Sequence, residues 1–138
     1  MKQYLECDEE QLKATNSYWT AREIEQQPRV WREAFAEIER QQEAINRWLD
    51  PILDNSELRI VLSGAGTSSF IGESLAPWLR KKLNRRVESL STTDIVSDPA
   101  QYFAEDIPTL MISFARSGNS PESVASVDLA NQVLTQCY

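Results

Sequence analysis

Residues 58–69 read Leu58-Arg59-Ile60-Val61-Leu62-Ser63-Gly64-Ala65-Gly66-Thr67-Ser68-Ser69. The first five are mostly apolar and partly β-branched, which predicts a short buried strand. The next seven are small or polar, and their glycines permit a tight turn. A helical pattern follows from about Ser69 to Leu83, in which Pro77 is expected to cause a kink or a restart. The stretch therefore predicts a strand, a turn suited to ligand binding, and a helix.

The same order of signals recurs further along the chain. Residues 87–90 predict a weak second strand, and residues 109–114 predict a third. The third strand leads into Ala115-Arg116-Ser117-Gly118-Asn119-Ser120-Pro121-Glu122 and then a helical pattern as far as Leu134. Ser120 before Pro121 is typical of an N-cap followed by the first helical residue. Alternating strands and helices predict a doubly wound parallel α/β sheet.

The first part of the chain is predicted to be helical. Thr20 and Glu23 have the spacing of a capping box, and Pro28 is expected to end that short helix near Gln27 and to begin the next one. The second helix, ending near Pro51, carries an apolar stripe made of Trp31, Phe35, Ile38, Ile45, Leu49 and Ile52. Such a stripe covers a domain edge or a dimer face, which we favour, or forms a coiled-coil arm. We divide the chain into a helical segment, 1–56, and a ligand-binding portion, 57–138.

Composition narrows the class of protein. The 138 residues include 14 Lys and Arg and 21 Asp and Glu, so the net charge is −7. This balance argues against binding to nucleic acid or an anionic membrane, and no apolar run approaches the ~20 residues of a membrane span. The chain has no histidine and two cysteines, Cys7 and Cys137, near opposite ends. We therefore expect a cytoplasmic protein without a metal site, a cofactor or a His-dependent nucleophile.

The two turns predict a site for an anion. In open parallel sheets, ligands bind beyond the carboxyl ends of the strands, where helix N-termini present free N–H groups. The turns lack the third glycine of a dinucleotide fingerprint and the lysine of a P-loop. A hydroxyl-lined pocket with few charges suits a phosphosugar. Two alternatives stay open: the serines only cap helices and the glycines only make turns, and Arg116 either pairs with the anion or points to solvent.

The two turns resemble the signature turns of the sugar isomerase (SIS) domain, on residues 64–68 and 113–122. In addition, residues 23–28, Glu-Ile-Glu-Gln-Gln-Pro, resemble a segment that precedes this domain in glucosamine-6-phosphate synthase and its relatives. The sequence of residues 115–123 most resembles that of the tagatose-6-phosphate ketose/aldose isomerases, a group also described as galactosamine-6-phosphate deaminase/isomerases. The resemblance implies an incomplete flavodoxin-like αβα domain that binds a phosphorylated sugar or aminosugar.

The resemblance also implies which residues hold the phosphate. The hydroxyls map to Ser68, Ser117 and Ser120, with Thr67 adjacent, and the backbone amides to Gly66 and Gly118. Ala115 and Arg116 stand where the synthase has a serine and a glutamine, so one hydroxyl is lost and one positive charge is gained. This departure bears on how the phosphate is held, and the expectation that an anion binds there is unaffected by it.

Members of this group have two such domains of about five strands each, whereas this chain predicts three strands and stops at Tyr138, where a fourth would begin. The resemblance thus implies an amino-terminal part of a sugar-phosphate isomerase or aminosugar-6-phosphate deaminase, inactive by itself and homo-oligomeric. It assigns no catalytic residue, because the base of the synthase lies beyond that point. One alternative is a non-catalytic phosphosugar sensor in a regulator; another is a fragment that associates through an uncovered sheet edge.

Overall fold

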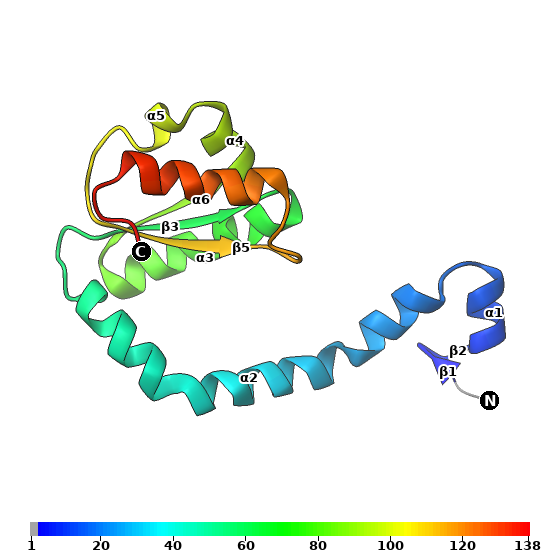
Figure 1. Ribbon diagram of the computed structural model, residues 1–138. Coiled ribbons are helices and arrows are strands. Elements are labelled where there is room, and N and C mark those ends of the chain that lie inside the picture. Colours follow the sequence, from blue (N-terminus) through cyan, green and yellow to red (C-terminus); the bar gives the residue numbers. More distant parts are fainter. Residues whose placement is uncertain (1–2) are drawn as a thin grey trace. The chain divides into compact units, whose positions relative to one another are not determined.

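The computed structural model describes residues 3–138, which Figure 1 traces from the N-terminal to the C-terminal end. Two compact units divide the chain between Trp48 and Leu49. Each unit has its own buried apolar cluster. The two units are therefore described separately.

The first unit contains a small N-terminal subfold and most of a long helix. Strands β1 (Gln3–Tyr4) and β2 (Cys7–Asp8) pair antiparallel, and helix α1 (Glu9–Ala14) follows. Helix α2 (Tyr18–Leu53) begins after a short turn. Tyr4, Leu12 and Ala21 form a buried cluster. The sequence did not predict β1, β2 or α1, which are short and depend on this cluster.

Helix α2 runs without interruption through Pro28, so the predicted break at that residue is wrong. A proline inside a helix removes the hydrogen bond to the carbonyl four residues earlier, here that of Ile24. Ile24 and Pro28 are both exposed, so water can hydrate the freed carbonyl. The helix also passes Pro51, where the sequence predicted its end, and stops two residues later at Leu53.

The apolar stripe on α2 is largely uncovered in the first unit. Trp31, Phe35 and Ile38 are 65%, 63% and 59% exposed. Trp31 and Phe35, together with Pro28 and Arg32, border a shallow hollow of about 490 Å³. Further along the same helix, Ile52 is buried in the apolar cluster of the second unit.

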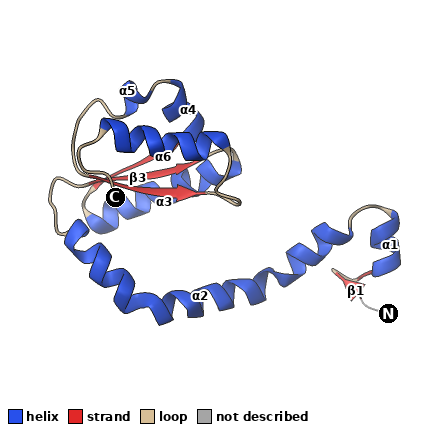
Figure 2. Ribbon diagram, in the orientation of Figure 1, coloured by secondary structure: helices blue, strands red, loops and turns tan. Residues whose placement is uncertain are grey.

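The second unit is a three-stranded parallel sheet with the order β4-β3-β5 (Figure 2). Its elements are β3 (Arg59–Gly64), α3 (Thr67–Leu83), β4 (Arg86–Ser91), α4 (Thr92–Ser97), α5 (Pro99–Tyr102), β5 (Thr109–Phe114) and α6 (Pro121–Val133). The parallel flavodoxin-like architecture is therefore confirmed. Pro77 lies inside one continuous α3, without the expected restart.

Helices cover both faces of this sheet, with α3 on one side and α4, α5 and α6 on the other (Figure 1). The α3 side buries Ile60, Leu62, Val87 and Leu110 together with Ala76 of the helix. The opposite side buries Ile95, Phe103, Ala130 and Leu134. Side chains of successive strand residues point to opposite faces, which is why Leu110 and Met111 belong to different clusters.

The last residues of the chain return to the sheet beside β5. The amide of Thr109 donates to the carbonyl of Gln136, and that of Tyr138 donates to the carbonyl of Thr109, both at 3.0 Å. Thr109 and Cys137 form a parallel bridge. Residues 136–138 thus meet the start of β5 through an isolated bridge, at the place where the sequence predicted a fourth strand to begin.

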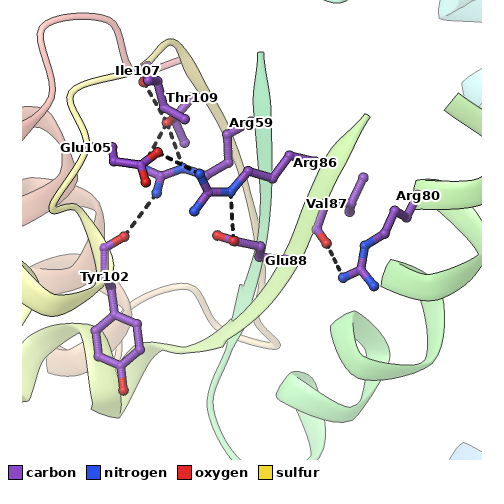
Figure 3. Close-up of polar contacts among 9 residues, drawn as sticks. All are labelled: Arg59, Arg80, Arg86, Val87, Glu88, Tyr102, Glu105, Ile107 and Thr109. Carbon is purple, nitrogen blue, oxygen red and sulfur yellow. Dashed lines mark hydrogen bonds and ion pairs between the residues drawn. The ribbon is translucent and has the colours of Figure 1, made fainter. Parts of the chain in front are cut away.

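A buried arginine lies at the amino end of β3 (Figure 3). The Arg59 guanidinium donates to the Thr109 hydroxyl at 3.1 and 3.2 Å and to the carbonyl of Tyr102 at 3.0 Å. It also lies 5.4 Å from the ring centre of Phe103. Desolvation lowers the pKa of Arg59 from its ordinary value. The charge is thus held by neutral acceptors and an aromatic face.

None of the helices among residues 3–138 is long and apolar enough to cross a membrane.

Candidate functional site

The two predicted turns leave neighbouring strands at the same edge of the sheet. In the parallel pairing of β3 with β5, Gly64 is the register partner of Phe114. These are the last residues of their strands, so the turns 65–66 and 115–120 both start at the carboxyl edge. The structure therefore places them side by side, as expected for a ligand site of a parallel sheet.

The first turn depends on a glycine at the N-cap of α3. Gly66 has φ of 55° and ψ of −127°, a backbone conformation that residues other than glycine rarely adopt. Its carbonyl accepts bonds from the amide of Ser69 at 3.0 Å and from the Ser69 hydroxyl at 2.8 Å. Thr67 and Ser68 begin the helix, with Thr67 exposed and Ser68 half-buried.

The second turn has a glycine at positive φ as well, Gly118 at 70°. The amide of Asn119 donates to the Ser117 hydroxyl at 3.4 Å, which closes a local turn. Ser120 is the N-cap of α6 and Pro121 its first residue, as predicted. The Ser120 hydroxyl makes no capping bond to the backbone and pairs instead with the Ser123 hydroxyl at 2.8 Å.

These turns offer several hydrogen-bond donors. The backbone amides of Gly66 and Gly118 make no hydrogen bond within the described part of the chain. The Ser117 hydroxyl is exposed, and the Ser68 and Ser120 hydroxyls are half-buried. Free amides at the N-termini of α3 and α6 lie at the positive ends of the helix dipoles, which favour an anion. The arrangement suits a phosphate group with several oxygens.

A hollow of about 500 Å³ opens beside the second turn. Arg116, Ser117 and Gly118 line it, together with Ser123 and Asp128 of α6. No residue of the first turn lines this hollow, so it extends from the second turn along α6. Arg116 is exposed and forms no ion pair among residues 3–138.

The sequence did not single out Ser123, Ser69 or Asp128. Ser69 and Ser123 are 9% and 7% exposed and each bonds to the N-cap residue of its helix. The only signal for them is a serine three residues after the N-cap of each helix, Gly66 and Ser120. No group of three metal-ligating side chains comes together in the described residues.

Comparison with known proteins gives a family match and several relatives. The model of the SIS domain matches residues 52–137. The D-galactosamine-6-phosphate deaminase AgaS of Shewanella sp. (strain ANA-3) is 50% identical over 132 residues, which are 94% of this chain and 34% of that protein. The protein of the same name from Escherichia coli O157:H7 is 47% identical over 125 residues, which are 91% of this chain and 33% of that protein.

Two solved structures match most of the chain. The tagatose-6-phosphate ketose/aldose isomerase from Escherichia coli superposes with a TM-score of 0.86 and 47% identity, over 91% of this chain and 34% of that one. A structure from Clostridium novyi NT superposes with a TM-score of 0.94 and 44% identity, over 99% and 35%. The chain thus spans about a third of the length of the relatives it matches.

Proposed function

Because this chain belongs to the SIS domain family, we propose that it binds the phosphate of a sugar or aminosugar 6-phosphate between its two glycine turns. The site consists of Ser68, Ser117 and Ser120, with Thr67, Arg116 and the amides of Gly66 and Gly118. The observation that carries this proposal is the register pairing of Gly64 with Phe114, which brings both turns to one edge of the sheet.

The donors suit a phosphate better than a carboxylate or a nucleotide. A phosphate monoester presents three acceptor oxygens and nearly two negative charges at neutral pH. Two helix N-termini and three hydroxyls supply separate donors for these oxygens. One cation, Arg116, adds charge without the lysine that nucleotide-binding loops place on a triphosphate.

The reaction of the whole protein is the one named for its relatives: deamination of galactosamine 6-phosphate or interconversion of tagatose 6-phosphate with its aldose partner. Both need a base that moves a proton between adjacent sugar carbons. We assign no such base among residues 1–138. This chain supplies phosphosugar binding, and we expect no turnover from it alone.

Calorimetric titration with galactosamine 6-phosphate and tagatose 6-phosphate tests the proposal. We expect binding of the phosphorylated sugars, none of unphosphorylated galactosamine, and about a tenfold weaker affinity in Ser117→Ala, because a hydrogen bond to a charged oxygen is lost. Ser126→Ala is the control, since that buried hydroxyl donates only to the carbonyl of Ser123. Unchanged affinity in Ser117→Ala would remove the assignment.

We also propose that the protein is a cytoplasmic homo-oligomer that binds neither nucleic acid nor membrane. Exposed Trp31, Phe35 and Ile38 on α2 support self-association, since large apolar patches on a surface usually mark an interface. Cys7 and Cys137 are both free thiols, which suits a reducing compartment. The division into a helical segment, 1–56, and a SIS portion, 57–138, belongs to the same proposal.

A further inference from the structure

Two buried serines occupy the same position in the two helices of the proposed site. Ser69 is the third residue of α3, and Ser123 is the third residue of α6. Each hydroxyl lies 2.8 Å from an oxygen of the preceding N-cap residue. The partners differ, and that difference decides what each serine can do.

The Ser69 hydroxyl forms its hydrogen bond with the backbone. It donates to the carbonyl of Gly66, an oxygen that only accepts. Binding of an anion at the turn leaves this bond as it is. Ser69 therefore shapes the first turn and does not respond to the ligand.

Ser123 is paired with another hydroxyl, that of Ser120. The Ser120 hydroxyl donates this bond and the Ser123 oxygen accepts it. Because a hydroxyl can both donate and accept, the two can exchange these roles when a ligand binds. Ser123 is 7% exposed and makes no other side-chain hydrogen bond within residues 3–138. It also lines the hollow beside Arg116 and Ser117, so Ser123 borders the proposed site.

An anion changes which hydroxyl donates. Phosphate oxygens only accept, so Ser120 must turn its proton toward them and away from Ser123. The oxygen of Ser120 is then free to accept the proton of Ser123. We propose that Ser123 is a positioning residue that donates to Ser120 when phosphate is bound, orienting the Ser120 hydroxyl and polarising it toward the anion. Two hydrogen bonds in series strengthen one another, particularly where one is buried.

This inference rests on the proposed function, because it requires the phosphate to contact Ser120. The competing explanation is that Ser123 only fills space in the first turn of α6. Ser126 provides the comparison. It is 0% exposed, lies three residues further along the same helix, and donates to the carbonyl of Ser123 at 3.0 Å without reaching Ser120.

The experiment titrates four variants of the full chain with galactosamine 6-phosphate and follows the phosphorus resonance by NMR. The variants are Ser120→Ala, Ser123→Ala, Ser123→Thr and Ser126→Ala, each checked for an unchanged melting temperature. We expect Ser123→Ala to weaken affinity about three- to tenfold and to shift the bound phosphorus resonance. Ser123→Thr keeps the hydroxyl and should restore both, and Ser126→Ala should bind as the parent does.

The outcomes separate this inference from the proposed function. If Ser120→Ala weakens binding and Ser123→Ala does not, the positioning role is wrong while the site stands. An equal loss in Ser126→Ala and Ser123→Ala, or no rescue by threonine, shows that helix packing is responsible and also overturns the role. If neither Ser120→Ala nor Ser117→Ala changes the affinity, the proposed site itself is wrong.

Discussion

Gly64 and Ser68 approach so closely that a Cβ atom on Gly64 would lie 2.6 Å from the backbone carbonyl carbon of Ser68. The same Cβ would lie 2.7 Å from the Ser68 carbonyl oxygen. Real Cβ atoms do not come this near to backbone atoms, so any side chain here pushes the first turn of α3 away from β3. Close packing of strand and helix at this point is what positions the first turn of the proposed site.

Gly64→Ala should therefore destabilise the chain by about 1–3 kcal/mol, the usual cost of overpacking a well-packed site. Denaturant unfolding measures this difference. Gly118→Asn is the matched control, because a Cβ there meets no atom within 4 Å and asparagine tolerates positive φ. Equal stability of Gly64→Ala and the parent would mean that this turn is looser than the structure indicates.

Arg59 is expected to be the most sensitive charged residue of the second unit. Arg59→Ala leaves the Tyr102 carbonyl without its partner and removes packing against Phe103, so we expect a loss of about 3 kcal/mol. Arg59→Met keeps most of the side-chain volume and buries no charge, so it should lose less stability than Arg59→Ala. Arg29→Ala, which breaks an exposed ion pair with Glu33, should change stability by less than about 0.5 kcal/mol.

The order of these three variants in urea unfolding is the test. A loss in Arg59→Ala no larger than in Arg29→Ala would contradict the buried hydrogen bonds described here.

Asp106 is expected to make stability depend on pH at the acid end. Its carboxylate accepts from the Thr135 hydroxyl at 2.6 Å and the Thr135 amide at 2.8 Å, and these bonds lower the pKa of Asp106 below 3.8. The folded state favours the charged form of Asp106. The stabilisation that its bonds to Thr135 give the folded state is therefore present above pH 3.8 and is lost as the pH falls through the lowered pKa.

Asp106→Asn should consequently melt at a lower temperature than the parent at neutral pH, and the difference should shrink below pH 3.8. Thermal unfolding across pH 2.5 to 7, followed by circular dichroism, gives the two curves at about half-unit steps. Asp54→Asn is the control, since the Asp54 side chain is exposed and forms no hydrogen bond in residues 3–138. A difference that stays constant with pH would exclude the Asp106–Thr135 pair as its source.

The exposed stripe on α2 is expected to mediate self-association. The double variant Trp31→Glu/Phe35→Glu places two carboxylates on this stripe and should shift the protein toward monomer in sedimentation equilibrium. Arg47→Glu makes the same change in net charge on the other side of the helix and should leave the oligomeric state alone. A parent that is monomeric at all concentrations would contradict the interface.

Strands β3 and β5 could be predicted because each is a short, mostly apolar run followed by a glycine turn. Strand β4, Arg-Val-Glu-Ser-Leu-Ser, has only two apolar residues and gave a weaker signal. Strand β5 begins and ends at the predicted residues, Thr109 and Phe114, between Pro108 and the second glycine turn. Helices α4 and α5 were not predicted, because six and four residues are too few to display a helical period. Thr92-Thr93-Asp94 starts α4 directly after β4.

The long helix shows where a local rule fails. A proline usually ends a helix, yet α2 passes Pro28 since the freed carbonyl is on the solvent side. In the site, the glycines and hydroxyls of the two turns are visible in the sequence. The role of Ser123 could not be predicted, because a serine in a helix is ordinarily exposed. Its burial beside Ser120 follows from the packing of α6, which the sequence does not display.

The most direct test of the shared phosphate site follows the amide resonances of Gly66 and Gly118 in the ¹⁵N-labelled chain during titration with galactosamine 6-phosphate. If one phosphate sits between the carboxyl ends of β3 and β5, both amides shift together and yield the same Kd. Movement of one glycine alone, two different affinities, or no movement of either would contradict a single site made by both turns.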